Sequence, residues 1–382
     1  MNVDDSDRTP AGTTMRAAVL YGAGDLRIED RPRPSPRPGE VLLEVGTVGL
    51  CGTDASEYTN GPRMFPVHER HPVSGHQGPM IIGHEFAGRV VALGPDVGPE
   101  WLGRDVASCG AISCTGCWQC QRGRPNLCTS YVAVGLHRDG ALAEYVTTPL
   151  QNCSPVDTLG MPPDAAALGQ PMSIAVHACS RARVQDGERV LIFGVGGIGA
   201  FLVYAVSAAG GRVIAVDASA DRLALAARLG ALATFAAQTA NAEALVSALD
   251  GPPEVVFEAS GRPEALALAL RVLPPGGRLV PVGLQSHAVE LDLRQLTLSE
   301  LELIGTMAMV REHDFDRALK LVAGRRAGWG DVAPTVVPLE ELAAGGLKTI
   351  ADGKAEAVKL LVDPRTTTSR PSRTRTTEPT AV

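Results

Sequence analysis

The sequence predicts an α/β protein with two domains, a mainly β, barrel-like domain followed by a doubly wound parallel sheet. The chain has 382 residues, of which 45% are hydrophobic, and this is enough apolar material for two cores. From residue 15 to about residue 150, Gly and Pro interrupt short apolar runs, as in strands joined by loops. Beyond Pro163, Ala-rich helical periodicity alternates with β-branched runs, which favours parallel strands with helices on both faces.

The individual elements follow from these patterns in chain order. Apolar runs predict strands of the first domain at 15–20, 40–48 and 86–92. The second domain is predicted to contain strands at 190–193, 212–216, 255–257 and 278–282, with helices that include 221–229 and 263–272. A further helix is expected at 314–323, and the apolar run 358–362 is expected to return to the first domain.

Domain boundaries follow from the changes in composition along the chain. Residues 15–172 and 311–363 are assigned to the first domain, and residues 173–310 to the second. The ends, 1–14 and 364–382, are polar and carry few apolar side chains to bury, so we expect both to be disordered tails.

Charge and hydropathy exclude several kinds of partner. The net charge is −7 and the basic residues are scattered except near the C-terminus, so we expect no nucleic-acid partner. The N-terminus has no signal-peptide pattern, which makes a cytoplasmic location the default expectation. The uncharged stretch 190–211 is long enough to cross a bilayer, but its four closely spaced glycines favour a strand, a turn and a buried helix, and no membrane partner is expected.

Four cysteines form the most specific motif in the chain. Cys114, Cys117, Cys120 and Cys128 lie close enough in sequence to surround one Zn²⁺ at about 2.3 Å per sulfur. Such a closed tetrathiolate site is structural, because it leaves no position for substrate. Disulfides are the alternative, but they require an oxidising compartment, for which the sequence gives no sign.

A glycine-rich motif predicts a dinucleotide site. Gly194, Gly196 and Gly199, with Gly197 and Ile198 between them, directly follow a predicted strand and open an apolar helix. The first glycine permits the tight turn, the second lets a pyrophosphate approach the backbone, and the third allows close packing of helix on strand.

The end of the next strand predicts the choice of dinucleotide. Asp217 lies roughly twenty residues further on, where a carboxylate accepts hydrogen bonds from the adenosine ribose and repels a 2′-phosphate, so NAD is favoured over NADP. The alternative for Asp217 is a helix cap, although Ser219 and Asp221 are also suited to that role. Arg222 is equally consistent with stacking on adenine and with an exposed helix position.

A second metal site is suggested more weakly by Cys51 and His84, which come from separate loops. A catalytic zinc needs few protein ligands and one exchangeable position. Taken alone, however, a single cysteine and a single histidine are more often a packed thiol and a satisfied imidazole.

Together, the motifs resemble one family. The sequence around Gly83-His84-Glu85 and Gly103-Arg104-Asp105-Val106, the four cysteines and the 194–199 motif resemble the zinc-dependent medium-chain dehydrogenases, in the same order and over roughly 15–364. The stretches 51–58, 71–75 and 170–173 are most similar to the sorbitol and 2,3-butanediol dehydrogenase branch. The resemblance implies a GroES-like first domain, a Rossmann second domain and an assembly of two or four copies.

The resemblance also implies roles for single residues. Cys51 and His84 would bind the catalytic zinc, and Glu85 would bind it or support a ligand. Thr53 would pass on the proton of a substrate hydroxyl that zinc has made more acidic, while hydride goes to the nicotinamide. The segment 258–261 and Gly283 match cofactor-holding positions, although plain strand-end turns explain them equally well.

The chain departs from this branch at two positions. Gln170 replaces the usual glutamate before Pro171, so the metal site would carry one negative charge fewer. Ser56 replaces a histidine of the proton relay. Among the nearby loop histidines, His68, His71 and His76, one is a substitute for that relay or all three are merely solvated. Three further cysteines are expected to be buried and inert: Cys109, Cys153 and Cys179.

These observations predict an enzyme that uses zinc and NAD to interconvert a secondary alcohol and a ketone on a small polyol, diol or cyclitol-like substrate. An idle NAD-binding sensor or structural protein is one alternative, since Gln170 and Ser56 depart from the family pattern. A zinc-independent enoyl or quinone reductase is the other, but the retained cysteines and His84 argue against it.

Overall fold

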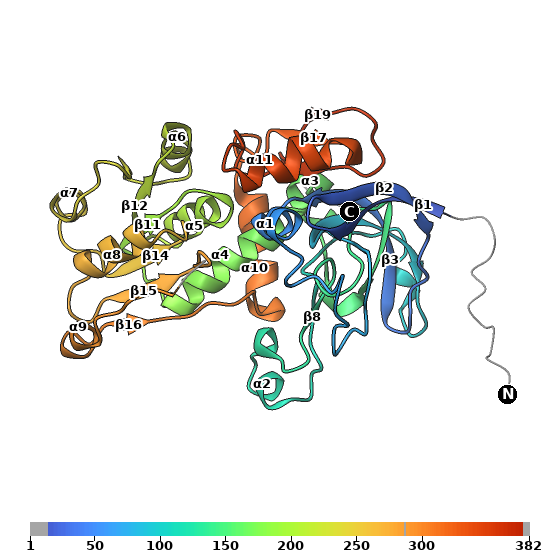
Figure 1. Ribbon diagram of the computed structural model, residues 1–382, viewed down its shortest axis with the longest axis horizontal. Helices are drawn as coiled ribbons and strands as arrows, with labels where there is room; N and C mark the ends of the chain where they lie inside the picture. Colours follow the sequence, from blue (N-terminus) through green and yellow to red (C-terminus); the bar gives the residue numbers. More distant parts are fainter. Residues whose placement is uncertain (1–13, 286–287, 377–382) are drawn as a thin grey trace.

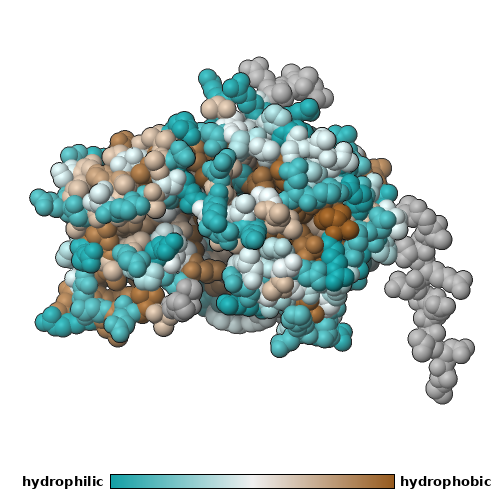
Figure 2. Space-filling model, turned by 45° about the horizontal axis from the view of Figure 1, so that its top comes forward, coloured by the Kyte–Doolittle hydropathy of each residue, from teal (hydrophilic) through white to brown (hydrophobic). Residues whose placement is uncertain are grey.

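The computed structural model describes residues 14–285 and 288–376, which form two parts (Figure 1). Figure 1 shows the two parts side by side, with helix α4 (Gly169–Ala182) running between them. The space-filling view is hollowed at the same junction (Figure 2). The α/β class and the division into a mainly β part and a parallel-sheet part are confirmed.

The first part is built from largely antiparallel strands. Its strands are β1 (Thr14–Gly22), β2 (Asp25–Pro32), β3 (Glu40–Gly49), β4 (Met80–Ile81), β5 (Glu85–Leu93), β6 (Asp105–Ser108), β7 (Ala111–Ile112), β8 (Val132–Ala133), β9 (Tyr145–Pro149), β10 (Cys153–Pro155), β17 (Thr335–Val337), β18 (Leu361–Val362) and β19 (Arg370–Pro371). They form sheets in the orders β2-β1-β4, β7-β8 and β10-β6-β5-β3-β18-β17-β19, with β9 also paired to β3. The predicted strands 15–20, 40–48 and 86–92 correspond to β1, β3 and β5.

Strand β3 lies at the centre of this part, because nearly all of its residues are buried on both faces. It pairs with β5 on one side and with β9 and β18 on the other. The apolar run 358–362 therefore returns to the sheet of the first part through β18. Helices also accompany these strands: α1 (Gly52–Asn60), α2 (Trp118–Gln121), α3 (Pro163–Ala166) and α11 (Lys348–Ala351), which lies against α1.

The second part is a six-stranded parallel sheet. Its strands are β11 (Arg189–Phe193), β12 (Arg212–Asp217), β13 (Ala233–Ala236), β14 (Val255–Glu258), β15 (Arg278–Pro281) and β16 (Glu302–Leu303). The spatial order is β13-β12-β11-β14-β15-β16. Successive strands are added on one side of β11 up to β13 and then on its other side from β14 onward, so the switch point lies between β11 and β14. In doubly wound sheets a ligand binds at the carboxyl ends of the strands beside such a switch point.

Helices cover both faces of the parallel sheet. They are α5 (Gly197–Ala208), α6 (Ala220–Arg228), α7 (Ala242–Ala248), α8 (Pro263–Val272) and α9 (Leu293–Leu298). Alternate residues of β11 explain how the faces are filled: Val190 and Ile192 pack with α4 and α5, whereas Leu191 and Phe193 pack with α8. The uncharged stretch 190–211 is therefore β11, a turn and α5, and no described helix is long and apolar enough to span a membrane.

The expected boundary at 172/173 requires a correction. It falls inside α4, whose buried residues pack against α5 of the second part and against α10 (Asp316–Gly324). The helical periodicity of this segment continues through Pro171, because a proline within the first turn of a helix leaves the hydrogen-bonding pattern intact. The two parts therefore share a helix and have no linker here.

The C-terminal tail predicted at 364–382 is also wrong for residues 364–376, which we call the C-terminal strap. Its strand β19 pairs antiparallel with β17, and Arg370 forms two bonds of 2.7 and 3.0 Å to the buried Asp164 carboxylate. The Thr374 hydroxyl accepts a 2.8 Å hydrogen bond from the backbone of Trp329, whose ring packs on Phe201 of α5. Polar contacts hold the strap, so a count of apolar residues failed to detect it.

Candidate functional site

The four-cysteine lobe, residues 114–128, projects from the first part and carries α2 (Figure 1). All four sulfur atoms lie within 4.8 Å of one another. Cys117 Sγ and Cys120 Sγ are 3.6 Å apart, which is too far for a disulfide, and all eight cysteines of the chain are free thiols. The predicted metal cluster is therefore preferred over paired cystines.

Backbone N–H groups in the lobe point at the sulfur atoms. The N–H groups of Cys114 and Ser130 donate to Cys128 Sγ at 3.2 and 3.3 Å, and that of Cys117 donates to Cys114 Sγ at 3.3 Å. Hydrogen bonding from the backbone of Cys120 lowers the pKa of Cys117 to about 5. Desolvation and the neighbouring thiols raise the pKa of Cys120 to about 11, so the four sulfur atoms become thiolates together only with a cation among them, and the donor set fits a closed zinc site.

The second cluster consists of Cys51, His84 and Glu85, whose ligand atoms also lie within 4.8 Å of one another. Cys51 joins the end of β3 to the start of α1, while His84 and Glu85 stand at the start of β5. Because β3 and β5 are neighbours, their ends bring together residues that are 33 positions apart. A soft thiolate, an imidazole and a carboxylate suit zinc and leave room for an exchangeable ligand.

A carboxylate positions the histidine of this cluster. Asp54 accepts a 2.9 Å hydrogen bond from the backbone of Cys51, and its other oxygen lies 3.4 Å from His84 Nδ1. Burial alone lowers the pKa of His84, but the Asp54 charge raises that pKa well above its usual value. A metal-binding histidine commonly directs its second ring nitrogen at a carboxylate, and this pair has that arrangement.

Glu85 is neutralised by a residue that the sequence did not reveal. Lys359 Nζ lies 2.6 Å from both carboxylate oxygens of Glu85 and 3.1 Å from the carbonyl of Leu50. Burial opposes the charge of Lys359, yet the Glu85 carboxylate raises the pKa of this lysine above its usual value. Gly49 makes room for the pair, because a Cβ there would lie 2.5 Å from Glu85 Oε2.

A signal for Lys359 was present in the sequence. It is the single charged residue in the apolar run 358–362, and a buried lysine requires a partner. The partner could not be read from the run itself, because Glu85 lies 274 positions away.

Three other residues of this site that the sequence singled out, Thr53, Gln170 and Ser56, lie in different surroundings. The Thr53 hydroxyl is 3.8 Å from Cys51 Sγ, close to the cluster. Gln170 is half-buried in the first turn of α4, and its carbonyl accepts a bond from Ser173. Ser56 is exposed on α1. The structure therefore places Thr53 near the cluster and leaves the metal contact of Gln170 as a prediction.

The three loop histidines make their contacts away from the metal cluster. His71 Nδ1 accepts a 3.0 Å hydrogen bond from the backbone of Ser74, and its ring stacks on His137 with 4.6 Å between centroids. His76 contacts the carbonyl of Gly78 at 3.2 Å, and His68 is exposed. None of them belongs to the described group around Cys51.

The three cysteines that were expected to be inert are buried, as predicted. Desolvation raises the pKa of Cys109 to about 11 and that of Cys179 to about 12, and it raises the pKa of Cys153 as well. Such thiols remain protonated at neutral pH, so they are poor nucleophiles and metal ligands.

The glycine-rich turn between β11 and α5 has two kinds of glycine. Gly194 has φ +86° and Gly199 packs so closely that a Cβ would lie 1.8 Å from the Gly194 carbonyl, so both positions require glycine. A Cβ at Gly196 would have Arg222 Nη1 as its nearest neighbour, at 3.9 Å, and one at Gly197 would meet nothing within 4 Å. This open side, at the uncapped N-terminus of α5, suits a pyrophosphate.

A cavity of about 770 Å³ extends from this turn across the switch point of the sheet. Gly194, Gly196, Asp217 and Arg222 line it, as does Ser260. Asp217 ends β12 and accepts bonds from the backbone of Val195 and Ser219, at 2.7 and 2.9 Å. The cap of α6 is Ser219, which accepts from the Arg222 backbone, so the alternative capping role for Asp217 does not hold.

A buried carboxylate shapes the next part of the cleft. Glu258, at the end of β14, accepts hydrogen bonds from the backbone of Ser260 at 2.7 Å and of Gly261 at 3.0 Å. It also accepts one from Gln285 at 3.0 Å. Gly283 packs against this loop, since a Cβ there would lie 2.4 Å from the Gly261 nitrogen. Gly283 therefore shapes the loop through close backbone packing.

A polar network also joins the four-cysteine lobe to the second part. The buried Asn126 amide donates to the carbonyl of Met307 at 2.8 Å and lies 3.4 Å from His177 Nε2. His177, on α4, is 2.7 Å from the Asp314 carboxylate. Local sequence patterns could not indicate this network, because its members come from separate segments.

The fold and both clusters agree with comparisons to known proteins. Residues 37–158 match the family model described as alcohol dehydrogenase GroES-like domain, and residues 197–324 match the one described as zinc-binding dehydrogenase. The first match contains β3 and β5 with the Cys51 cluster and the four-cysteine lobe, and the second contains the parallel strands from β12 onward.

Similar proteins span most of the chain. A sorbitol dehydrogenase of Bombyx mori is 33% identical over 305 residues, which are 78% of this chain and 85% of that protein. An erythritol/L-threitol dehydrogenase of Mycolicibacterium smegmatis is 31% identical over 360 residues, which are 92% and 98% of the two chains. The crystal structure of a 2R,3R-butanediol dehydrogenase from Bacillus subtilis matches with a TM-score of 0.84 at 27% identity, covering 92% of this chain and all of that one.

Proposed function

Because the chain belongs to the zinc-binding medium-chain dehydrogenases of the alcohol dehydrogenase superfamily, we propose that it interconverts a secondary alcohol and a ketone on a small polyol, diol or cyclitol-like substrate, with NAD as the hydride acceptor. One observation carries the proposal: the cluster of Cys51, His84 and Glu85 and the glycine-rich turn with Asp217 occur in one chain. The cluster is suited to bind a metal ion that acts as a Lewis acid, and the glycine-rich turn with Asp217 is suited to bind a dinucleotide.

Cys51, His84 and Glu85 would hold the catalytic zinc, and the four cysteines of the lobe would hold a structural one. When bound, the catalytic zinc lowers the pKa of a substrate hydroxyl and polarises the carbonyl of the product. Asp54 orients His84, and Lys359 offsets the charge of Glu85. The Thr53 hydroxyl, 3.8 Å from Cys51 Sγ, is suited to accept the substrate proton and pass it on.

The charge of the site also bears on substrate acidity. Gln170 supplies a neutral amide where the resembling branch has a carboxylate, so the metal site is less negative. A less negative ligand set strengthens the pull on electrons of a bound oxygen. Ser56 is exposed on α1, so the proton would leave through solvent or through a ribose hydroxyl.

The preference for NAD rests on Asp217. Its carboxylate lines the cavity at the end of β12, where the ribose of a dinucleotide lies in sheets of this topology. A 2′-phosphate there would meet a negative charge. Arg222 lines the same cavity, and its positive charge would attract that phosphate. The ratio of turnover with NAD to turnover with NADP therefore measures whether Asp217 or Arg222 determines the choice of cofactor.

The proposed substrate class rests on what the relatives' names share. Sorbitol, erythritol, threitol and 2,3-butanediol all carry neighbouring hydroxyl groups. A vicinal diol or polyol is therefore the first class to assay.

As part of the same proposal, copies would associate through the edge strand β16, where the exposed Leu298 and Leu303 lie close to a sheet edge.

The test is an assay of NADH formation with a panel of vicinal diols, polyols and isolated secondary alcohols, with NAD and NADP in parallel. Turnover of vicinal diols with NAD, lost on complete removal of zinc, is expected. Unchanged NADH formation after zinc has left the Cys51 cluster would refute a metal-dependent mechanism.

A matched variant separates an enzyme from an idle dinucleotide-binding protein. Cys51→Ser should abolish turnover and leave NADH binding, measured by fluorescence titration, within about twofold, because Cys51 does not line the dinucleotide cavity. A wild-type protein that binds NADH but turns over no member of the panel would favour the idle protein.

A further inference from the structure

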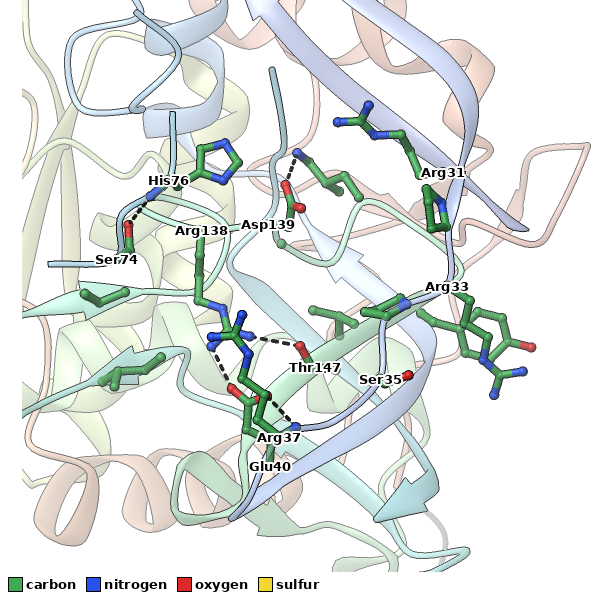
Figure 3. Close-up of a pocket in the computed structure, with 18 of the residues that line it drawn as sticks. Arg31, Arg33, Ser35, Arg37, Glu40, Ser74, His76, Arg138, Asp139 and Thr147 are labelled. Atoms are coloured by element: carbon green, nitrogen blue, oxygen red, sulfur yellow. Dashed lines mark hydrogen bonds and ion pairs between the residues drawn. The ribbon is translucent and has the colours of Figure 1, made fainter. Parts of the chain in front are cut away.

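A second cavity, of about 960 Å³, lies in the first part and carries a concentration of arginines. Its walls come from the end of β2 with the segment that follows it (residues 31–37), the loop 73–76, the loop 138–140 and strand β9 (Figure 3). Among its described lining residues are none of the side chains assigned above to zinc or to the dinucleotide. Its volume is within the range of small-molecule sites.

The charge of this arginine cavity is positive, although the whole chain carries −7. Arg31, Arg33, Arg37 and Arg138 line it. The acidic residues among the described lining are Glu40 and Asp139, and both are already bonded. Glu40 accepts a 2.7 Å bond from Arg138, and Asp139 accepts a 2.9 Å bond from the backbone of Ile81.

Two of the arginines are available to a ligand. Within residues 14–285 and 288–376, the Arg37 guanidinium makes no ion pair or hydrogen bond, and that of Arg33 contacts only the ring of Tyr145, 3.9 Å from its centroid. Arg138 is held in place by Glu40 and by a 2.9 Å bond to the Thr147 hydroxyl. Figure 3 shows Arg37 and Arg138 next to each other beside Glu40, whereas Arg33 lies on the other side of the segment that carries Ser35.

The backbone that carries three of the arginines is stiff. Residues 31–38 read Arg-Pro-Arg-Pro-Ser-Pro-Arg-Pro, so every second residue is a proline with a fixed φ. Alternating prolines favour an extended, polyproline-like chain that loses little entropy when a ligand binds. The arginines are therefore presented from a preorganised segment.

We propose that the arginine cavity binds a small anion that carries a phosphate or pyrophosphate group. Guanidinium groups bind phosphate oxygens in pairs, and several arginines around one hollow can neutralise a charge of two or more. A half-open cavity of this size in an acidic protein suits a small molecule better than a nucleic acid. The site also touches the metal-binding segment, because Ile81, which Asp139 holds, lies three residues before His84.

Inorganic pyrophosphate is the probe, and isothermal titration calorimetry is the measurement. NADH is kept saturating, so that the glycine-rich turn is occupied and does not take up the probe. We expect saturable binding with one pyrophosphate per chain that weakens as salt is raised. The double variant Arg33→Ala/Arg37→Ala should bind about tenfold more weakly or worse, because it removes two charged donors.

Arg27→Ala is the matched control. Arg27 lies on β2 outside the cavity, over the ring of Tyr21 at 4.0 Å and paired with Asp25 at 2.7 Å, so its loss removes an exposed arginine and a ring contact without touching the proposed site. Its pyrophosphate affinity should stay within about twofold of wild type. Arg37→Gln, which keeps a long polar side chain, provides a second variant if the double variant folds poorly.

Two results would overturn the proposal: no saturable binding at millimolar pyrophosphate, or equal affinities for the wild type, the double variant and Arg37→Gln. Neither depends on the dehydrogenase activity. A difference between Arg27→Ala and the double variant stands even if the protein turns over no alcohol.

Discussion

At the scale of single residues, the pair of Glu85 and Lys359 is the most exacting feature of the metal site. Both side chains are almost completely buried, and their charged atoms lie 2.6 Å apart. Neither charge is tolerable alone, since a buried ion without its partner loses its hydration and gains nothing in return. The pair thus fixes the position of Glu85 beside Cys51 and His84.

Lys359→Met should therefore destabilise the fold by about 3–5 kcal/mol, because Glu85 would be left buried and uncompensated. Urea unfolding at a fixed zinc concentration measures the effect. Adding Glu85→Gln to Lys359→Met should restore part of the loss, since no buried charge then remains.

Lys354→Met is the control for this prediction. Lys354 also pairs with a carboxylate, Asp352 at 3.3 Å, but its side chain is 75% exposed, so its loss should change stability by less than about 1 kcal/mol. Equal effects of the two substitutions would contradict the role given to Lys359.

The residues of the site differ in how far they could be predicted. The spacing of the four cysteines indicates a metal by itself, whereas Cys51 and His84 gave only a weak signal, which the family resemblance strengthened. Lys359 and Asp54 bind no metal and act through contacts, and contacts between distant segments depend on the folded sheet. Asp54 was visible beside Cys51, but its approach to His84 required β3 and β5 to be neighbours.

At the scale of elements, the C-terminal strap is the feature that sequence composition most clearly misjudged. Its Arg370 lies against Asp164, which is 2% exposed and also accepts a 2.6 Å bond from Thr47. The strap thereby joins β3 and α3 to β17, and through Trp329 it reaches α5 of the parallel sheet.

Arg370→Ala should reduce the free energy of unfolding by about 2–3 kcal/mol, because a buried carboxylate loses a two-pronged charged partner while Thr47 and the Arg373 backbone remain as donors. Denaturant or thermal unfolding measures the effect. The control is Arg365→Ala on the same strap: its pair with Glu44 is 41% and 33% exposed, so a loss below about 1 kcal/mol is expected.

If Arg370→Ala lowered stability as little as Arg365→Ala, the ion pair between the strap and Asp164 would not contribute to holding the fold together.

Strands of the parallel sheet were readily predicted, because long β-branched runs such as β11 and β12 are buried on both faces. The short edge strands β13 and β16 carried no comparable signal, since one is half-buried and the other is two exposed residues.

At the scale of the whole molecule, two metal clusters in one chain make the zinc content informative. The described residues contain the four-cysteine lobe and the Cys51 cluster, so purified protein should hold about two zinc ions per chain. Elemental analysis of the purified protein gives this ratio directly.

Variants assign the two ions. Cys51→Ser should lower the zinc content by about one and leave the far-ultraviolet circular dichroism unchanged. Cys117→Ser should also remove about one, but it should lower the thermal midpoint, because the lobe has little apolar core of its own. A content of one ion, retained in Cys51→Ser and lost in Cys117→Ser, would show that only the lobe binds metal.

The two parts were predictable as classes, and their connections were not. The switch point, the glycine-rich turn and Asp217 follow from local pattern, since each lies within one strand–turn–helix unit. The sharing of α4, the return of β18 and the docking of the strap depend on segments that are more than a hundred residues apart.

The return of β18 also sets an order of events during synthesis. Strand β3 and Glu85 leave the ribosome early, but Lys359, β18 and Arg370 emerge only after the whole parallel sheet has been translated. Until then Glu85 and Asp164 have no cationic partner to accompany them into a core. The metal site built on β3 and β5 is therefore completed by a lysine that is translated 274 residues after Glu85, and a nascent chain truncated before Lys359 would hold a folded parallel sheet beside an unfinished catalytic one.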